Sequence, residues 1–154
     1  MSSVNLTEII SVETLQKVQD AFSEMTGFAA LTTDADGHPV TEGSHFTEYC
    51  MDHIRKNELG CKNCELCDKY GAETTMRTGH ATTYTCHSGL VDFSAPIIVE
   101  GELVGCFIGG QALANEPDPS EIKQVAQNLN MDFAVLWQSV QKVTVRDRRD
   151  IEAG

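Results

Sequence analysis

Apolar residues recur at spacings of three and four in the first part of the chain, and this pattern predicts an amphipathic helix over residues 11–26. The positions that share one face are Leu15, Val18, Phe22 and Met25. Ser11 can cap the first turn, and Gly27 suits the left-handed position after the last one. We therefore expect this helix to pack by its apolar face.

Short segments rich in Thr, Tyr, Val and Ile, separated by turn residues, predict five strands. The first two flank the turn Asp34-Ala35-Asp36-Gly37, which is typical of a tight hairpin. The third, fourth and fifth follow one another and are separated by further turn residues. The predicted strands are Phe28–Thr33, His38–Thr41, Ala81–Cys86, Leu90–Val99 and Leu103–Gln111.

Four further helices are predicted, two before the third strand and two after the fifth. They span residues 46–56, residues 61–78 ending at Gly79, residues 121–129 with Ser120 as the cap, and residues 132–142. This order favours an α+β fold, with a five-stranded antiparallel sheet covered on one face by helices and a ligand cavity beneath them.

The pattern predicts one domain, residues 1–154. It divides into an N-terminal helix (1–26), a core (27–112) and C-terminal helices (113–154). The final segment VRDRRDIEAG resembles the start of another helix, so we expect a module of a longer chain with an output domain beyond it. Terminal helices of this kind are compatible with a homodimer.

Composition narrows the class of function. The chain has 154 residues, 41% of them apolar, and a formal net charge of −12. This charge disfavours direct contact with nucleic acid or an anionic membrane. The sequence contains no apolar run long enough to span a bilayer and no signal peptide, so we expect a cytoplasmic protein. We expect no enzymatic activity, because the sequence offers no acid/base pair, phosphate loop or Ser/His/Asp set.

Five of the six cysteines lie between Cys50 and Cys86. The segment CKNCELC places Cys61, Cys64 and Cys67 on about one third of a helix circumference. Thiolates at this spacing suit Zn²⁺ or an iron–sulfur cluster, which commonly takes its last ligands from distant segments. Redox-active thiols and inert burial are the alternatives.

Other candidates are weaker. Cys106 lies in an apolar strand and is interpreted as a core residue. His87 follows Cys86 directly, and neighbouring strand residues point to opposite faces, so a catalytic pair is not expected. His53 shares a helix face with Cys50 and is a reserve ligand.

The chain also resembles the PocR sensory domain family, a PAS-like ligand-binding module of prokaryotic signalling proteins. The resemblance rests on the segment LQKVQDAFSEMTGFAALTTDADGHPVTE, the Tyr49-Cys50 step, CELCD, YTCHSGLVDFSAPIIVEGELVG, and the GGQ that ends at Gln111. These segments cover most of residues 9–112.

The resemblance implies a sensor that binds a small hydrocarbon derivative such as a short diol and passes its signal to an attached output domain. It places the family's recurring cysteines at Cys50, Cys64 and Cys86, with His87 alongside. This chain differs by carrying Cys67, where many relatives have Ser, and by adding Cys61. Cys67 supplies a fourth thiolate and shifts the interpretation towards a metal centre.

Two hypotheses follow for the sensing site. In the first, Cys50, Cys64, Cys67 and Cys86 hold an iron–sulfur cluster or zinc ion, with Cys61 in reserve, and the domain senses a redox or small-molecule signal. In the second, a metal-free pocket binds a small organic ligand with Tyr84, His87 and Gln111 among its polar groups. An enzyme is the third and weakest alternative.

Overall fold

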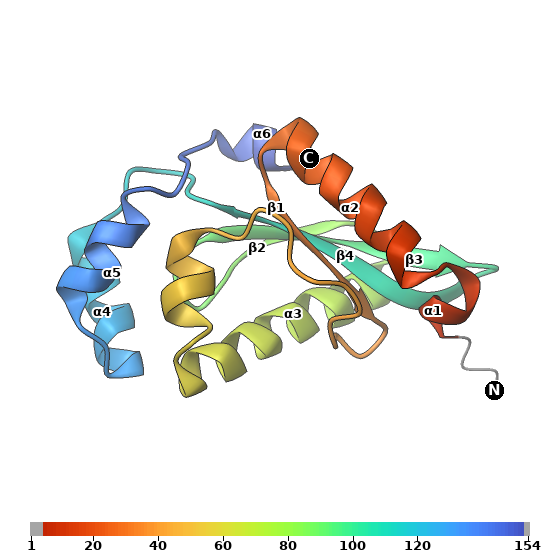
Figure 1. Ribbon diagram of the computed structural model, residues 1–154, viewed down its shortest axis with the longest axis horizontal. Coiled ribbons are helices and arrows are strands. Elements are labelled where there is room, and N and C mark those ends of the chain that lie inside the picture. Colours follow the sequence, from red (N-terminus) through yellow and green to blue (C-terminus); the bar gives the residue numbers. More distant parts are fainter. Residues whose placement is uncertain (1–4, 153–154) are drawn as a thin grey trace.

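The computed structural model describes residues 5–152, which form an α+β fold around one antiparallel sheet (Figure 1). The strands are β1 (Ala29–Asp34), β2 (Thr82–Thr85), β3 (Val91–Val99) and β4 (Glu102–Ala112), in the spatial order β1-β4-β3-β2. The helices are α1 (Leu6–Ile9), α2 (Val12–Thr26), the π-helical turn η1 (Tyr49–Ile54), α3 (Glu58–Thr78), α4 (Pro119–Leu129), α5 (Phe133–Val140) and α6 (Arg148–Glu152).

The described residues form four strands, and the prediction of a fifth at His38–Thr41 is not confirmed. This segment makes a single isolated bridge to β1, between Pro39 and Thr33. Pro39 has no N–H to donate, and the backbone N–H of Thr32 donates to the Thr41 hydroxyl at 3.0 Å instead of to a neighbouring carbonyl. The segment therefore lies beside β1 without forming a continuous ladder.

The sheet was expected to carry helices on one face, with N- and C-terminal helices in addition; α3 covers one face, and the N-terminal helix α2 covers the other (Figure 1). On one face, Phe22 of α2 packs edge-on against Phe107 of β4, with ring centroids 5.0 Å apart. On the other face, α3 packs against β4, where the Thr75 hydroxyl lies 3.5 Å from the Cys106 sulfur. Side chains alternate along a strand, so each face of the sheet has its own apolar surface to bury.

Most predicted helices and caps are confirmed. The Ser11 hydroxyl accepts a hydrogen bond from the Thr14 backbone N–H at 3.2 Å, and Gly27 ends α2 with φ 78°. The cap of α4 is Asp118, not Ser120, because the Asp118 carboxylate accepts from the Ser120 N–H at 2.9 Å and Pro119 occupies the first helical position. The predicted α3 is continuous through its internal glycine.

Gly71 lies inside α3 because the helix approaches the sheet closely there. A Cβ at this position would lie 2.9 Å from the Tyr84 hydroxyl oxygen and 3.1 Å from the Ser94 Cβ. Contacts this short exclude a side chain without movement of the helix, so the glycine allows α3 to lie against β2 and β3.

The C-terminal helices pack onto η1 and the beginning of α3. Tyr49, Ile54 and Cys64 share one apolar cluster with residues of α4 and α5, including Leu129 and Leu136. The Asn57 side-chain amide donates to the Leu129 carbonyl at 3.0 Å, which links the start of α3 to the end of α4. None of the helices in residues 5–152 has the length and apolar character needed to cross a bilayer.

Candidate functional site

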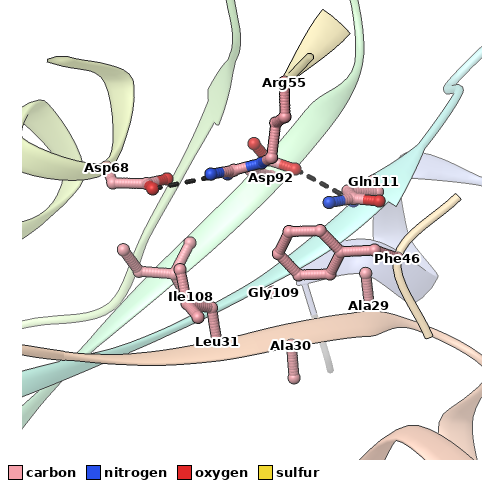
Figure 2. A pocket seen from close by; sticks show the side chains of 10 residues that line it. All are labelled: Ala29, Ala30, Leu31, Phe46, Arg55, Asp68, Asp92, Ile108, Gly109 and Gln111. Atoms are coloured by element: carbon pink, nitrogen blue, oxygen red, sulfur yellow. Dashed lines mark hydrogen bonds and ion pairs between the residues drawn. The ribbon is translucent and has the colours of Figure 1, made fainter. Parts of the chain in front are cut away.

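A small cavity, with about 20 Å³ available to the centre of a water-sized molecule, lies on the α3 side of the sheet. Figure 2 shows its two contrasting sides: a row of polar side chains faces a group of mostly apolar residues. The polar row consists of Asp68, Arg55, Asp92 and Gln111, and the apolar part consists of Ala29, Ala30, Leu31, Phe46, Ile108 and Gly109. A pocket with an apolar wall and a few convergent polar groups is the usual form of a small-molecule site.

Arg55, the residue after η1, occupies the middle of the polar row. One of its terminal nitrogens (Nη2) lies 3.5 Å from the Asp68 carboxylate, and its guanidinium lies 4.9 Å from the centre of the Phe46 ring. Only 19% of the Arg55 side chain and 5% of the Asp68 side chain are exposed. The guanidinium charge is thus held by one carboxylate and one aromatic face.

Asp68 is the residue after Cys67 on α3. Burial raises the pKa of its carboxyl group to about 6, and the nearby Arg55 opposes the rise. Near neutral pH most Asp68 side chains are therefore ionised and paired with Arg55.

Asp92 lies on β3 and lines the cavity. Burial raises the pKa of its carboxyl group to about 7, while a hydrogen bond from the Gln111 backbone N–H opposes the rise. That bond is 2.9 Å long. Perturbed acidic groups inside a cavity are typical of functional sites.

Gln111 connects the cavity to the segment before η1. Its backbone N–H donates to Asp92, and its side-chain oxygen accepts from the Thr47 backbone N–H at 2.8 Å. Gln111 has φ 52°, which is uncommon for a residue other than glycine. The bonds on both sides of Gln111 hold it in this conformation.

The predicted metal ligands come together beside this cavity. Cys50 of η1 and Cys64 of α3 belong to one buried cluster, and Cys86, directly after β2, packs against it. Cys67, on α3, lies close enough to Cys64 to raise the pKa of its thiol. The reserve candidate Cys61 is half-buried one turn earlier on α3, and Cys106 is a core residue as expected.

Burial is the main cause of a raised thiol pKa at all four positions. The pKa of Cys50 and of Cys64 rises to about 12, and those of Cys67 and Cys86 also rise. Buried thiols of this kind stay protonated near neutral pH unless a cation stabilises the thiolates.

The spacing of the sulfur atoms tests the fit of a single ion. The Cys64 sulfur lies 3.2 Å from His87 Nε2, similar to the separation of roughly 3.5 Å between two ligands of one tetrahedral zinc ion. Within residues 5–152, however, no three cysteine or histidine donors of this set lie within 4.8 Å of one another. In this conformation the thiols therefore do not form a closed site for one ion.

The predicted organic-ligand residues lie around the same region. Tyr84 is 8% exposed, and within the described part of the chain its hydroxyl group has no hydrogen-bond partner. Burial, followed by the charge of Asp92, raises the pKa of Tyr84 well above its ordinary value. His87 is near Cys64, and burial lowers its pKa. The reserve ligand His53 is half-buried on η1.

Sequence reasoning missed Phe46, Arg55, Asp68 and Asp92. For Asp92 a signal existed, because a charged residue interrupts an apolar strand in LVDFSAPIIV, and buried charges are rare without a role. Arg55 and Asp68 offered no comparable signal, since charged residues are common on the exposed faces of helices.

Three comparisons relate this chain to known proteins. It is 28% identical over 128 residues to the regulatory protein PocR of Salmonella typhimurium, covering 82% of this chain and 42% of that protein. The chain therefore spans about two fifths of the length of this relative. It also resembles the structure of a GAF domain/HD domain protein from Geobacter sulfurreducens, with 13% identity, a TM-score of 0.44, and coverage of 90% of this chain and 99% of that one.

The third comparison is with a family model, which is described as the sensory domain found in PocR and matches residues 8–154. This match covers all but the first seven residues, including β1, α3 and the cavity-lining strands. The chain belongs to the PocR sensory domain family.

Proposed function

We propose that this chain is the sensory input module of a regulatory protein and that its signal is a small organic molecule bound in the cavity between α3 and the sheet. The observation that carries this proposal is the buried polar row of Asp68, Arg55, Asp92 and Gln111, set opposite apolar residues. Such a row is expensive to bury, and a ligand that completes its hydrogen bonds would explain its presence.

The size of the cavity limits the ligand. The centre of a water-sized molecule has about 20 Å³ in which to move there, roughly what one water molecule needs and far below the 300–1,000 Å³ of sites for drug-sized ligands. The ligand should therefore be a skeleton of a few carbon atoms with one or two polar groups, and its entry must displace lining side chains such as Phe46 and Arg55. A short diol, which the family resemblance implies, belongs to this class.

The packing of the C-terminal helices offers a route for the signal. Arg55 directly follows η1, and η1 packs against α5, where Ile54 and Val140 belong to one apolar cluster. The Lys142 ammonium also lies 2.9 Å from the Glu48 carboxylate, just before η1. A ligand that repositions Arg55 would therefore move η1 against α5, from which an output domain in the full-length protein could be controlled.

Thermal unfolding in the presence of small probes tests the proposal. We expect at least one of 1,2-propanediol, 1-amino-2-propanol and lactate to raise the melting temperature by several degrees, because a ligand at about 100 times its Kd stabilises the folded state by about 2.7 kcal/mol. If none of the three binds at millimolar concentration, the proposal fails.

A cavity-filling variant provides the structural control. Ala29→Val adds two methyl groups to the cavity wall, so ligand binding should be lost while the protein remains folded. Thr85→Val is the control, because it places the same valine side chain at an exposed position on β2 away from the cavity. Equal ligand affinity in both variants would place the ligand elsewhere.

The convergence of Cys50, Cys64, Cys67 and Cys86 favours a second candidate function, in which these thiols hold an iron–sulfur cluster or a zinc ion. Metal analysis and visible absorption of anaerobically purified protein test it. We expect iron and a brown colour, lost in Cys67→Ser and kept in the control Cys106→Ala. Protein that contains neither iron nor zinc would rule this candidate out.

A further inference from the structure

We propose that the cavity selects a cationic head group: a primary ammonium on a short apolar skeleton, with the Asp92 carboxylate as its counter-ion. This inference rests on the proposed function, because it names the chemical class of ligand for the same cavity. It departs from the neutral diol that the family resemblance implies.

The polar row contains more acidic groups than basic ones. Its one cation, Arg55, is already paired with Asp68 and stacked on Phe46. Asp92 accepts one hydrogen bond, from the Gln111 backbone N–H, and takes part in no ion pair among the described residues. The charge of Arg55 also acts on Asp92, but this one cation serves two carboxyl groups, so a ligand that brings a second cation gains a charge-assisted hydrogen bond.

The same arrangement disfavours an anionic ligand. Arg55 is the group that an anion would seek, but it is already paired with Asp68, and Asp92 belongs to the same polar row (Figure 2). An anionic head group would meet both carboxyl groups, and like charges at such separations repel. The net charge of −12 adds a long-range field that attracts cations and repels anions.

The apolar residues define the rest of the ligand. Leu31 of β1 and Ile108 of β4 are paired across the sheet and face the cavity together with Ala29. These side chains offer no polar atoms, so the part of the ligand opposite the ammonium should be a short alkyl group.

Three probes with one carbon skeleton separate the possible head groups: 1-amino-2-propanol is a cation, 1,2-propanediol is neutral and lactate is an anion. Their affinities for the full chain are measured by isothermal titration calorimetry at pH 8, where Asp92 is ionised and the amine is still protonated. We expect the amine to bind roughly ten- to a hundredfold more tightly than the diol, and lactate to bind most weakly.

Asp92→Asn tests the assigned residue. Its side-chain oxygen can still accept from the Gln111 N–H, so the fold and the binding of neutral ligands should be kept while the preference for the amine disappears. Asp36→Asn is the matched control, because it removes one negative charge from an exposed turn. This control should keep the preference for the amine.

The outcomes distinguish this inference from the proposed function. Binding of the diol or lactate at least as tightly as the amine overturns the inference and leaves the small-molecule function standing. Failure of all three probes overturns both. An unchanged preference for the amine in Asp92→Asn would also overturn the assignment of Asp92 as counter-ion.

Discussion

Replacing Asp92 by Asn should stabilise the protein at alkaline pH. Burial raises the pKa of the Asp92 carboxyl from its ordinary 3.8 to about 7. Between these two values the folded protein binds more protons than the unfolded chain, so the contribution of Asp92 to stability falls as pH rises. Above pH 7 the ionised Asp92 carboxylate lowers the free energy of unfolding by its full amount, about 4 kcal/mol.

The size of this pKa shift predicts how the effect of Asp92 on stability depends on pH. Linkage gives an unfavourable contribution of about 2 kcal/mol at pH 5 and about 4 kcal/mol at pH 8. Asn carries no charge, so Asp92→Asn removes this contribution and keeps an acceptor for the Gln111 N–H. The gap in unfolding free energy between variant and parent should therefore widen by about 2 to 3 kcal/mol from pH 5 to pH 8.

Urea denaturation followed by the fluorescence of Trp137, the single tryptophan, measures this gap. The comparison isolates the Asp92 carboxyl group, because its charged or titratable neighbours are the same in both proteins. These neighbours are Arg55, Asp68, Tyr84, Cys50, Cys64, Cys67 and Cys86. Asp36→Asn should show no widening. A gap that stays constant with pH, or a variant less stable than the parent at pH 8, would refute the reasoning.

Two further substitutions test the packing around the site. Gly71→Ala should destabilise the protein by about 1 to 3 kcal/mol despite the better helix propensity of Ala, because the added Cβ would collide with Tyr84. The control Glu73→Ala, at an exposed position on the same helix, should change the free energy of unfolding by less than about 0.5 kcal/mol. Arg146→Ala removes a hydrogen bond of 3.1 Å to the Thr26 carbonyl and should lower the free energy of unfolding by about 1 to 2 kcal/mol in the same denaturation assay. An unchanged free energy of unfolding would show that this contact adds no stability.

The sequence identified most of the local structure because local patterns determine it. The helix of residues 12–26 follows from apolar spacing and from the Ser11 and Gly27 caps, which act within one turn. The sequence also pointed to the thiols: Cys64 and Cys67 share a helix face, and the structure brings Cys50 and Cys86 to the same region. The metal itself stays a prediction.

The contacts between elements that are distant in the sequence depend on the tertiary structure. A segment such as His38–Thr41 has strand-like residues, but whether it joins the sheet depends on which partner satisfies the Thr32 N–H, and that partner is the Thr41 hydroxyl. The sheet is covered on both faces because Phe22 and α3 reach it from opposite sides, which no local pattern specifies.

The sensing site shows the same division. The sequence by itself determined the helices, most strands and the shared helix face of Cys64 and Cys67, since these depend on neighbours along the chain. Only the tertiary structure placed Arg55, Asp68 and Asp92 in one cavity, because they come from η1, α3 and β3 and acquire their pairing and perturbed pKa values through burial against one another.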